Sequence, residues 1–422
     1  MGLWTSTKLR EEFLTFFESK GHKIFPSSPL TNSGDPSVIL TTAGMQQFKP
    51  YYLDPKKADA DFGARRAVSS QKCFRTTDID EVGDATHNTF FEMLGNFAFG
   101  DYFKAEAIGF AFEFLTARLG FNPADLTVTV FEGDGEVPQD SQSRAIWKEL
   151  GIPETQIKTC GREDNFWGPT GDKGPCGPTS EIYVHGVEIW NLVFNEFYCE
   201  GSRLEPLKKK GVDTGMGLER LSCVMQQAQS SYDTDIFEPL LNIIARHAKH
   251  ADLPEELALR ASRIVADHIR GATFLMAEGL TPSNVKAGYI LRRILRRAIR
   301  FGHTLNIPHE VFDLLIKKTG TIYQSVYPEL WANRAQIRET FEKEYQVFGK
   351  TLKKGMAMFE KSLAASDNKF FDGRQAFFLF ATYGFPVELI EEMLKERGVR
   401  LDKEGFISAL EAHREVSKSS PS

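Results

Sequence analysis

The stretch that decides the fold is residues 69–97, which begins with SSQKCFR (69–75) and ends with TFFEMLGNF (89–97). Polar residues separate the two runs, which predicts two strands joined by a loop in a long antiparallel hairpin. Alternation assigns the second strand's side chains to two faces, with Phe91, Met93 and Gly95 on one and Phe90, Glu92 and Leu94 on the other. Arg75, at the end of the first strand, can bind a phosphate or carboxylate, and a neighbouring aromatic ring can stack on a base. An ordinary core hairpin explains the pattern more simply than a nucleotide site does.

The sequence around the hairpin divides into two parts. Up to about residue 240 it is rich in glycine, proline and aromatic residues, with alternating runs such as VEIWNLVFNEF (187–197), which predicts mixed α and β structure with mostly antiparallel strands. Beyond residue 232 the pattern is helical, with breaks expected at 279–283 and 365–368. The helices are expected at 236–250, 255–279, 286–303, 309–325, 329–364, 373–383, 386–398 and 403–418. The prediction is an α+β domain over 1–240 and an all-α domain over 241–422.

The composition excludes several classes of protein. The 422 residues, 41% hydrophobic and 26% charged, suit a globular chain of two or three domains at roughly 150 residues each. The formal net charge of −6 gives no overall attraction to nucleic acid, so any polyanion site must be local. Five cysteines without a CxxC pair favour neither a disulfide framework nor a zinc site, and no apolar run reaches the ~18 residues of a membrane helix. A cytoplasmic protein that does not span a membrane is expected.

Two glycine-rich stretches are further candidate sites. Residues 164–181 (DNFWGPTGDKGPCGPTSE) are so dense in glycine and proline that they predict a loop, either lining a site or merely crossing the fold. Residues 212–220 (VDTGMGLER) predict a strand that turns into a helix. Gly217 would let a ligand approach the backbone and Arg220 would lie at the helix start, although a tight turn also explains the glycines. Neither a P-loop nor a Rossmann fingerprint is present.

The segment KAGYILRRILRRAIR (286–300) carries six cations and no acid. On a helix its apolar side chains form one buried stripe, made of Ile290, Leu291, Ile294, Leu295, Ala298 and Ile299. The arginines form a cationic ridge beside that stripe, consisting of Arg292, Arg293, Arg296, Arg297 and Arg300. Like charges four residues apart repel, so the ridge favours a polyanionic partner, with pairing to acids elsewhere in the fold as the alternative.

Several segments, in order along the whole chain, resemble the alanyl-tRNA synthetases, a family of class II aminoacyl-tRNA synthetases. They are DP (35–36) with TAGMQQF (42–48), SQKCFR (70–75) with FFEMLGNF (90–97), DTGMGLER (213–220), ADHIR (266–270), LRRILRRA (291–298) and YGFP (383–386). The resemblance implies a class II antiparallel sheet flanked by helices, followed by an all-α domain that recognises the tRNA acceptor stem. It also implies activation of L-alanine with ATP and Mg²⁺ to alanyl-adenylate, and transfer of alanine to tRNA-Ala.

The resemblance also implies roles for individual residues. Arg75 and Arg220 would be catalytic, Arg75 holding the ATP α-phosphate and the alanine carboxylate and Arg220 the γ-phosphate. Asp213 would receive the alanine ammonium in a small pocket shaped by Met45, Trp167, Asn191 and Val193. Phe91 would stack on adenine, with Gly217, Glu92 and Glu181 as further ATP-site residues. Asn284 and the five ridge arginines would contact tRNA, and no zinc site is expected.

The chain also departs from the family pattern. Thr86, His87 and Asn88 replace an Arg-His-His triplet, which removes one cation near the nucleotide. Asn284 matches one of two residues that read the acceptor-stem G·U pair, but Ala381 replaces the second, an aspartate. The sequence ends before the family's zinc-containing editing domain, so it is either a naturally minimal enzyme or a fragment. We expect a monomer and an activity without editing that forms some seryl- and glycyl-tRNA. The alternatives are a paralogue that delivers an adenylated amino acid to a carrier protein or peptide, and a non-catalytic tRNA-binding module.

Overall fold

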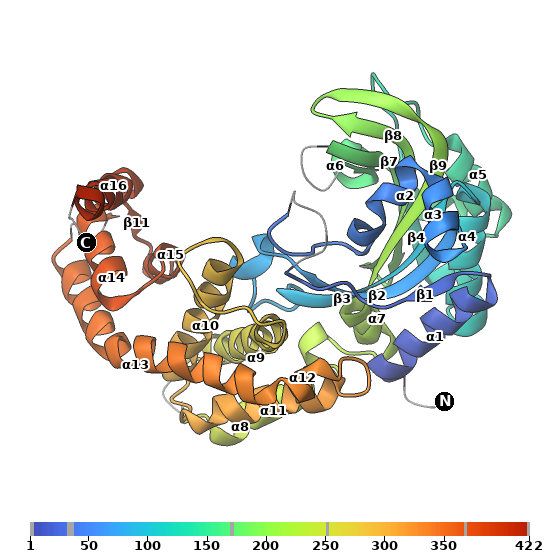
Figure 1. The fold of residues 1–422 in the computed structure, drawn as a ribbon. Coiled ribbons are helices and arrows are strands. Elements are labelled where there is room, and N and C mark those ends of the chain that lie inside the picture. The colour runs from blue at the N-terminus through green and yellow to red at the C-terminus, as the bar shows by residue number, and fades with distance from the viewer. Residues whose placement is uncertain (1–3, 32–37, 169–172, 250–252, 367–368, 420–422) are drawn as a thin grey trace. The chain divides into compact units, whose positions relative to one another are not determined.

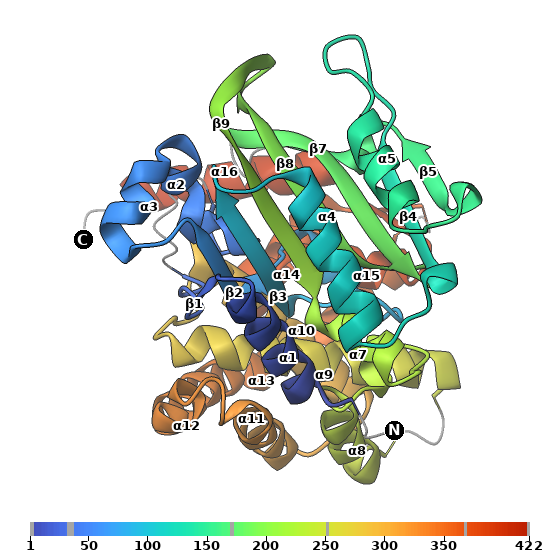
Figure 2. The ribbon, with the colours of Figure 1, turned by 90° about the vertical axis from the view of Figure 1, so that its right-hand side faces the viewer.

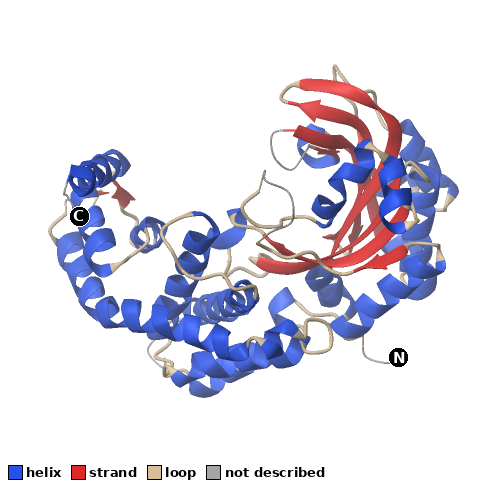
Figure 3. Cartoon of the chain, viewed as in Figure 1, coloured by secondary structure: helices blue, strands red, loops and turns tan. Residues whose placement is uncertain are grey.

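The computed structural model describes residues 4–31, 38–168, 173–249, 253–366 and 369–419. The chain forms two compact units, one of residues up to 75 with 88–239, the other of Thr76–His87 with the residues from 240 onward. Strands dominate the first unit and helices the second (Figure 3). The short segment Thr76–His87 packs with the helical unit, which the sequence did not indicate.

The first unit is built on a large, mostly antiparallel sheet (Figure 1). Its strands are β1 (Lys23–Phe25), β2 (Arg66–Phe74), β3 (Phe90–Phe99), β4 (Leu126–Phe131), β5 (Ile157–Cys160), β6 (Phe166–Trp167), β7 (Lys173–Val184), β8 (Val187–Glu200) and β9 (Arg203–Gly217). The order is β1-β2-β3-β9-β8-β7-β4-β5, with β6 paired to β7 off this path. Within the described part of this sheet, only the pairs β1–β2 and β4–β5 are parallel. The expected fold class is therefore confirmed.

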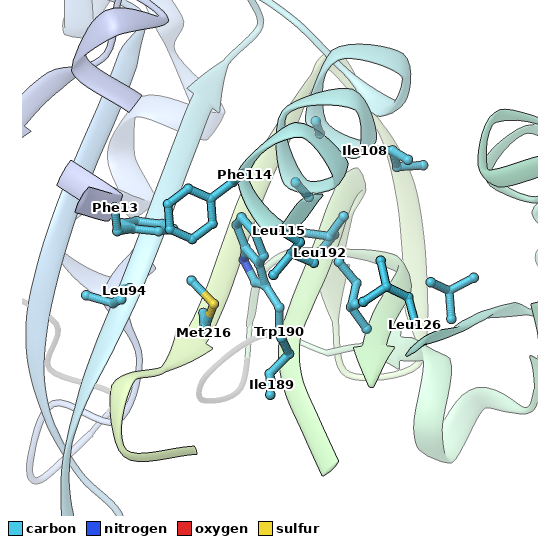
Figure 4. Close-up of a cluster of buried hydrophobic side chains, with 14 of the residues drawn as sticks. Phe13, Leu94, Ile108, Phe114, Leu115, Leu126, Ile189, Trp190, Leu192 and Met216 are labelled. Atoms are coloured by element: carbon cyan, nitrogen blue, oxygen red, sulfur yellow. The ribbon is translucent and has the colours of Figure 1, made fainter. Parts of the chain in front are cut away.

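Helices pack on this sheet. They are α1 (Ser6–Ser19), α2 (Lys49–Leu53), α3 (Pro55–Phe62), α4 (Lys104–Glu113), α5 (Ser141–Glu149), α6 (Arg162–Asn165) and α7 (Leu218–Met225), with the 3₁₀ turn η1 (Gly44–Phe48). Helices α1 and α4 lie over the same face of the sheet (Figure 2). The core there brings Phe13 and Phe114 against Leu94, Trp190 and Met216 of the strands (Figure 4). We call this the helix-covered face.

The predicted hairpin is confirmed, and so is its alternation. Strands β2 and β3 pair antiparallel, with Cys73 opposite Phe91. Leu94 lies in the core of the helix-covered face. Phe97 faces the other way, into a separate cluster with Met45, Phe48 and Tyr52. The opposite face, which we call the site face, therefore begins at Phe91 and runs along every second residue of β3.

The loop predicted over 164–181 is wrong for most of its described residues, because residues 164–165 end helix α6, residues 166–167 form strand β6 and residues 173–181 belong to strand β7. The glycine and proline residues instead mark an irregular strand. The pairing of β7 with β8 shifts its register between Cys176 and Thr179, and Pro178 in this interval pairs with Phe166 of β6 instead. Gly177 lies so close to β8 that a Cβ there would be 1.9 Å from the Phe194 carbonyl oxygen. Residues 169–172 lie outside the described residues.

The second unit is almost entirely helical, as expected. Its helices are α8 (Glu238–His247), α9 (Glu255–Ala277), α10 (Lys286–Thr304), α11 (Glu310–Tyr323), α12 (Glu329–Ala332), α13 (Arg334–Ala364), α14 (Gly373–Tyr383), α15 (Val387–Lys395) and α16 (Lys403–Ser419). A two-stranded parallel sheet, β10 (Phe370–Phe371) with β11 (Arg400–Leu401), was not predicted. The single helix expected over 329–364 is broken at Asn333, whose side chain donates to the Ala277 carbonyl oxygen (2.7 Å).

The sequence predicts neither a disulfide framework nor a helix that spans a membrane. All five cysteine thiols are free. Among the described helices none combines the length and the apolar character needed to cross a bilayer.

Candidate functional site

Cross-strand pairing brings several of the expected substrate residues together on the site face. Asp213 of β9 lies opposite Val193 of β8, and the next row places Asn191 of β8 opposite Gly215. Glu181 of β7 pairs with Asn191 in turn. Residues paired across neighbouring strands point to the same face, so these side chains form one patch on the site face.

Asp213 is the unusual group of this patch. Its carboxylate is buried, and it has neither an ion pair nor a hydrogen bond to any residue that the structure describes. Burial alone raises the pKa of Asp213 to about 7, because desolvation disfavours the charged form. A buried carboxyl without a partner is costly, and such groups mark sites that bind a complementary cation.

Polar atoms around Asp213 are also left without partners. The side-chain oxygen of Asn191 is buried and accepts no hydrogen bond from the described residues, although its nitrogen lies 3.5 Å from a Glu181 oxygen. Asn195, four residues along the same strand and on the same face, is fully buried with both amide atoms unpaired within the described parts of the chain. Sequence reasoning missed Asn195, although the alternation that selects Asn191 and Val193 also selects this residue.

Glu181 is buried beside Asn191. Its carboxylate accepts a hydrogen bond from the Tyr183 hydroxyl (2.7 Å), and burial raises the pKa of Glu181. One oxygen therefore stays weakly bonded, with only the 3.5 Å contact to Asn191. Glu181 therefore lies on the site face beside Asn191.

Arg75 follows β2 directly and has a free guanidinium. Its backbone nitrogen donates to the Thr89 carbonyl oxygen (2.9 Å), which closes the base of the loop between β2 and β3. Its guanidinium carbon lies 5.0 Å from the centre of the Phe91 ring, and no hydrogen bond to it is found in the described structure. A cation and an aromatic ring thus stand side by side on the half-buried end of the hairpin.

Glu92 requires a correction. It points to the helix-covered face, is fully buried, and binds Arg10 of α1 through both carboxylate oxygens (2.8 and 2.5 Å). Ser70 donates to it as well (3.2 Å). The alternation that puts Phe91 on the site face puts Glu92 on the other, so Glu92 holds α1 to the sheet and is not positioned to contact ATP.

The remaining expected residues lie at the edges of the site. Gly217 ends β9 and precedes α7, where Arg220 lies on the first turn and pairs with Glu188 (2.8 Å). This pair is half-exposed, so a phosphate can displace Glu188 at little cost. Trp167 of β6 has a buried ring nitrogen without a described partner, and Met45 of η1 is buried in the cluster with Phe97.

Helix α10 of the second unit has the expected apolar stripe, and all six of its residues are buried. Its arginines, however, do not form an exposed ridge. Arg296, Arg297 and Arg300 are more than nine-tenths buried. The five expected tRNA contacts each pair with an acid: Arg292 and Arg296 with Glu344, Arg293 with Asp80, Arg297 with Glu392, and Arg300 with Glu396.

The structure thus favours the alternative explanation of this segment, pairing with acids inside the fold. The acids come from α13, from α15 and the residue that follows it, and from the segment Thr76–His87, all far from α10 in sequence. Burial of arginines requires such partners, because an isolated charge in the interior is too costly. Arg292 and Arg293 keep some exposure, with side chains 21% and 14% accessible.

The two positions tied to acceptor-stem reading are both exposed. Asn284 lies just before α10, and its side-chain oxygen accepts a hydrogen bond from Arg292. Ala381 lies on the exposed side of α14. Thr86, which departs from the family pattern, and the neighbouring His87 both bind the Asp84 carboxylate.

Comparison with known proteins gives the family. The sequence model described as tRNA synthetases class II (A) matches residues 8–187 and 185–422. The chain belongs to this class II synthetase family. An alanine–tRNA ligase of Rubrobacter xylanophilus is 43% identical over 98% of this chain and 50% of its own length. One from Treponema pallidum is 43% identical over 97% of this chain and 72% of its own length.

Solved structures of other synthetases are only distantly similar to this chain. The S. aureus histidyl-tRNA synthetase matches 57% of this chain and 75% of its own, with 14% identity and a TM-score of 0.35. The Desulfitobacterium hafniense pyrrolysyl-tRNA synthetase matches 55% and 72%, with 12% identity and a TM-score of 0.34. This synthetase chain spans about half the length of the first curated relatives that it matches.

Proposed function

We propose that this chain carries the alanine activation and tRNA-charging functions of an alanine–tRNA ligase. The observation that supports this most directly is Asp213, a buried carboxylate without a cation in the described structure, facing Val193 and Asn191 on the site face. A zwitterionic amino acid needs an anion for its ammonium and a cation for its carboxylate. Asp213 and the free guanidinium of Arg75 supply the two, and the relatives named as alanine–tRNA ligases point to alanine.

The proposed reaction is attack of an alanine carboxylate oxygen on the ATP α-phosphorus. A P–O bond to the new alanyl group forms as the bond to pyrophosphate breaks, and alanyl-adenylate and pyrophosphate result. The 3′-terminal hydroxyl oxygen of tRNA then attacks the carbonyl carbon of the adenylate. The ester C–O bond forms as the acyl C–O bond to AMP breaks, AMP leaves, and the hydroxyl proton is released to water. A carboxylate is already a nucleophile at pH 7, so activation requires positioning and neutralisation of phosphate charge rather than a base.

In this scheme Arg75 binds the α-phosphate and the alanine carboxylate, and Phe91 stacks on adenine. Arg220 breaks its ion pair with Glu188 and binds the γ-phosphate. Gly217 lets the nucleotide approach the backbone. Val193, Trp167 and Met45 line a pocket that suits a methyl side chain.

Mg²⁺ is expected to neutralise the ATP phosphates when it is bound. Glu181 fits as its protein ligand, since one of its oxygens has only a long contact, whereas both Glu92 oxygens are held by Arg10. No cluster of three acidic, histidine or cysteine side chains suited to a metal occurs within the described ranges. Phosphate oxygens and water would therefore complete the coordination of this hard cation.

The helical unit is proposed to receive the acceptor stem. Asn284 and Arg292 are the candidates that remain exposed enough, with Arg293 beside them, whereas Arg296, Arg297 and Arg300 are committed to acids inside the unit. We place the reaction in the cytoplasm and assign it to a monomer. Because a pocket alone distinguishes alanine only weakly from serine and glycine, some serine and glycine are expected on tRNA.

The test is ATP–pyrophosphate exchange with each of the 20 amino acids and no tRNA. We expect exchange with alanine, weaker exchange with serine and glycine, and none for Asp213→Ala. The control is Asp101→Asn, which removes a surface carboxylate paired with Arg66 and should exchange like wild type. Exchange that prefers another amino acid, or survives in Asp213→Ala, would refute the proposal.

The second step is tested with tRNA-Ala transcripts carrying G·U or G·C at the acceptor-stem recognition pair. Charging of the G·U transcript is expected, with acid gels reporting alanyl-, seryl- and glycyl-tRNA. Weak discrimination between the two transcripts would follow from Ala381. Exchange without any charging would instead favour the paralogue that serves a carrier protein or peptide.

A further inference from the structure

The segment Thr76–His87 joins β2 to β3, the strands that lead to Arg75 and Phe91, yet it packs within the helical unit. Ile79 and Val82 are fully buried. Gly83 has a positive φ of 121° and lies against α9, where a Cβ would come within 2.7 Å of the Arg260 side chain. The segment, which we call the hairpin loop, is therefore seated specifically rather than left to solvent.

Arg297 of α10 binds this loop through both terminal nitrogens of its guanidinium. Nη1 donates to the Ile79 carbonyl oxygen (2.7 Å) and Nη2 to that of Val82 (3.2 Å). Nε and Nη2 donate to the two oxygens of Glu392 (2.8 and 2.7 Å), and Nη1 also contacts Nε2 of His268 (2.8 Å). A guanidinium has five N–H donors, and these five contacts use all of them.

The groups behind Arg297 fix its orientation. Glu392 binds it in the two-pronged geometry that arginine and carboxylate share, and Arg260 also donates to Glu392 (2.6 Å). His268 is fully buried beside Asp267 (2.9 Å), and burial lowers the pKa of His268, so the ring is neutral. Its Nδ1–H then donates to Asp267, which leaves Nε2 free to accept from Arg297.

We infer that Arg297 is a positioning residue for amino-acid activation: it fastens the hairpin loop, so that Arg75 and Phe91 at the loop's base keep the geometry that ATP requires. The base is closed by the Arg75–Thr89 backbone bond. This inference rests on the proposed function of Arg75 and Phe91. It replaces the role in tRNA contact that the sequence suggested for Arg297, since a phosphate could reach this guanidinium only if the loop were released.

The chain offers a matched pair of variants for the test. Glu392 and Glu396 lie one turn apart at the end of α15, and both bind Arg260 and one arginine of α10. Of these two acids only Glu392 holds Arg297, because Glu396 pairs with Arg300. Glu392→Gln and Glu396→Gln therefore remove the same charge from the same network, with and without an effect on the loop.

The experiment measures alanine-dependent ATP–pyrophosphate exchange of the full chain without tRNA. For E392Q we expect kcat/KM for ATP to fall by about tenfold or more, from weakened hydrogen bonds and lost positioning. E396Q should stay within about twofold of wild type, as expected for a site outside the chemistry. Arg297→Lys keeps the charge but loses the fork and should behave like E392Q. Hydrogen exchange of the peptide covering residues 76–87 should speed up in E392Q and R297K only.

The outcomes separate the two proposals. If wild type exchanges with alanine but E392Q matches E396Q, the proposed function stands and the inference is overturned. R297K that exchanges normally but loses tRNA binding would also overturn it, in favour of an RNA contact. Should R297K fail to fold, the comparison of E392Q with E396Q decides alone. A wild type without exchange for any amino acid would end both proposals.

Discussion

Charged groups are handled differently in the two units of this chain. On the site face of the sheet, Asp213 is buried with no described partner, whereas along α10 the arginines from 292 to 300 each pair with a carboxylate. Among the described residues, the carboxylate of Asp213 on the sheet has no partner of opposite charge, whereas each of the five arginines of α10 has one. Since an unpaired buried charge is costly, it persists where a ligand completes it, while paired buried charges are part of the fold itself.

The comparison predicts that removing one carboxylate from each unit changes the stability of the fold in opposite directions. The largest effect is expected for Glu344→Gln on α13. Glu344 is buried and binds Arg296 (2.6 Å), so its loss leaves an arginine charge without its partner in the interior. Breaking such a pair costs about 3–5 kcal/mol of stability. Urea unfolding, with hydrogen exchange of peptides from α10 and α13, measures this loss of stability. An unchanged urea midpoint would show that the stability of α10 does not depend on the pair of Arg296 and Glu344.

Asp213→Asn should change stability in the other direction. Because the folded-state pKa of about 7 lies above the value of 3.8 that is usual for an aspartate, the ionised carboxyl disfavours folding, increasingly as pH rises from about 4 to 7 and constantly above. At pH 8 the variant should be more stable by up to about 4 kcal/mol, at 1.36 kcal/mol for each pKa unit. The gain should vanish near pH 4.

Fluorescence of the buried Trp147 and Trp190 reports unfolding of the first unit for this comparison. A variant that is less stable than wild type at pH 8 would mean that Asp213 has a stabilising role. The same substitution is expected to abolish alanine activation. Asp213 would then lower the stability of the fold while being required for activity.

The pH dependence of alanine use sharpens the same point. Only the ionised form of Asp213 attracts an ammonium, so protonation below its pKa of about 7 competes with alanine. KM for alanine in the exchange assay should rise about tenfold for each pH unit below 7 and level off above it. KM for ATP should not follow this curve. A flat alanine profile between pH 5.5 and 8 would remove Asp213 from ammonium binding.

How far the sequence could predict these features depends on the range of the interactions. The hairpin, the strand–turn–helix at 212–220 and the helices of the second unit were predicted because their signals are local periodicities. Alternation alone was also sufficient to separate Phe91 from Glu92. Assigning Glu92 to ATP ignored that separation, and the structure shows its true partner, Arg10, 82 residues away.

The pairing of the α10 arginines could not be predicted in the same way. Glu344 is 48 residues from Arg296, and Glu392 is 95 from Arg297, so no local spacing connects them. A run of cations indicates only that counter-charges exist somewhere, in a ligand or in the fold. For residues 173–181 the local signal was misleading, because the glycine and proline residues that usually break strands here lie at a register shift within one.

The smallest effect should come from an ion pair on the surface of α13 itself. Lys343 pairs with Glu339 one turn away (2.6 Å), at a distance as short as that between Arg296 and Glu344, but both side chains are largely exposed. Water solvates these charges in the folded and unfolded chain alike, so Lys343→Gln should leave the urea midpoint unchanged within error. If this change destabilised α13 as strongly as Glu344→Gln does, pairing as such would stabilise the helix, and burial would not be what distinguishes the network of α10.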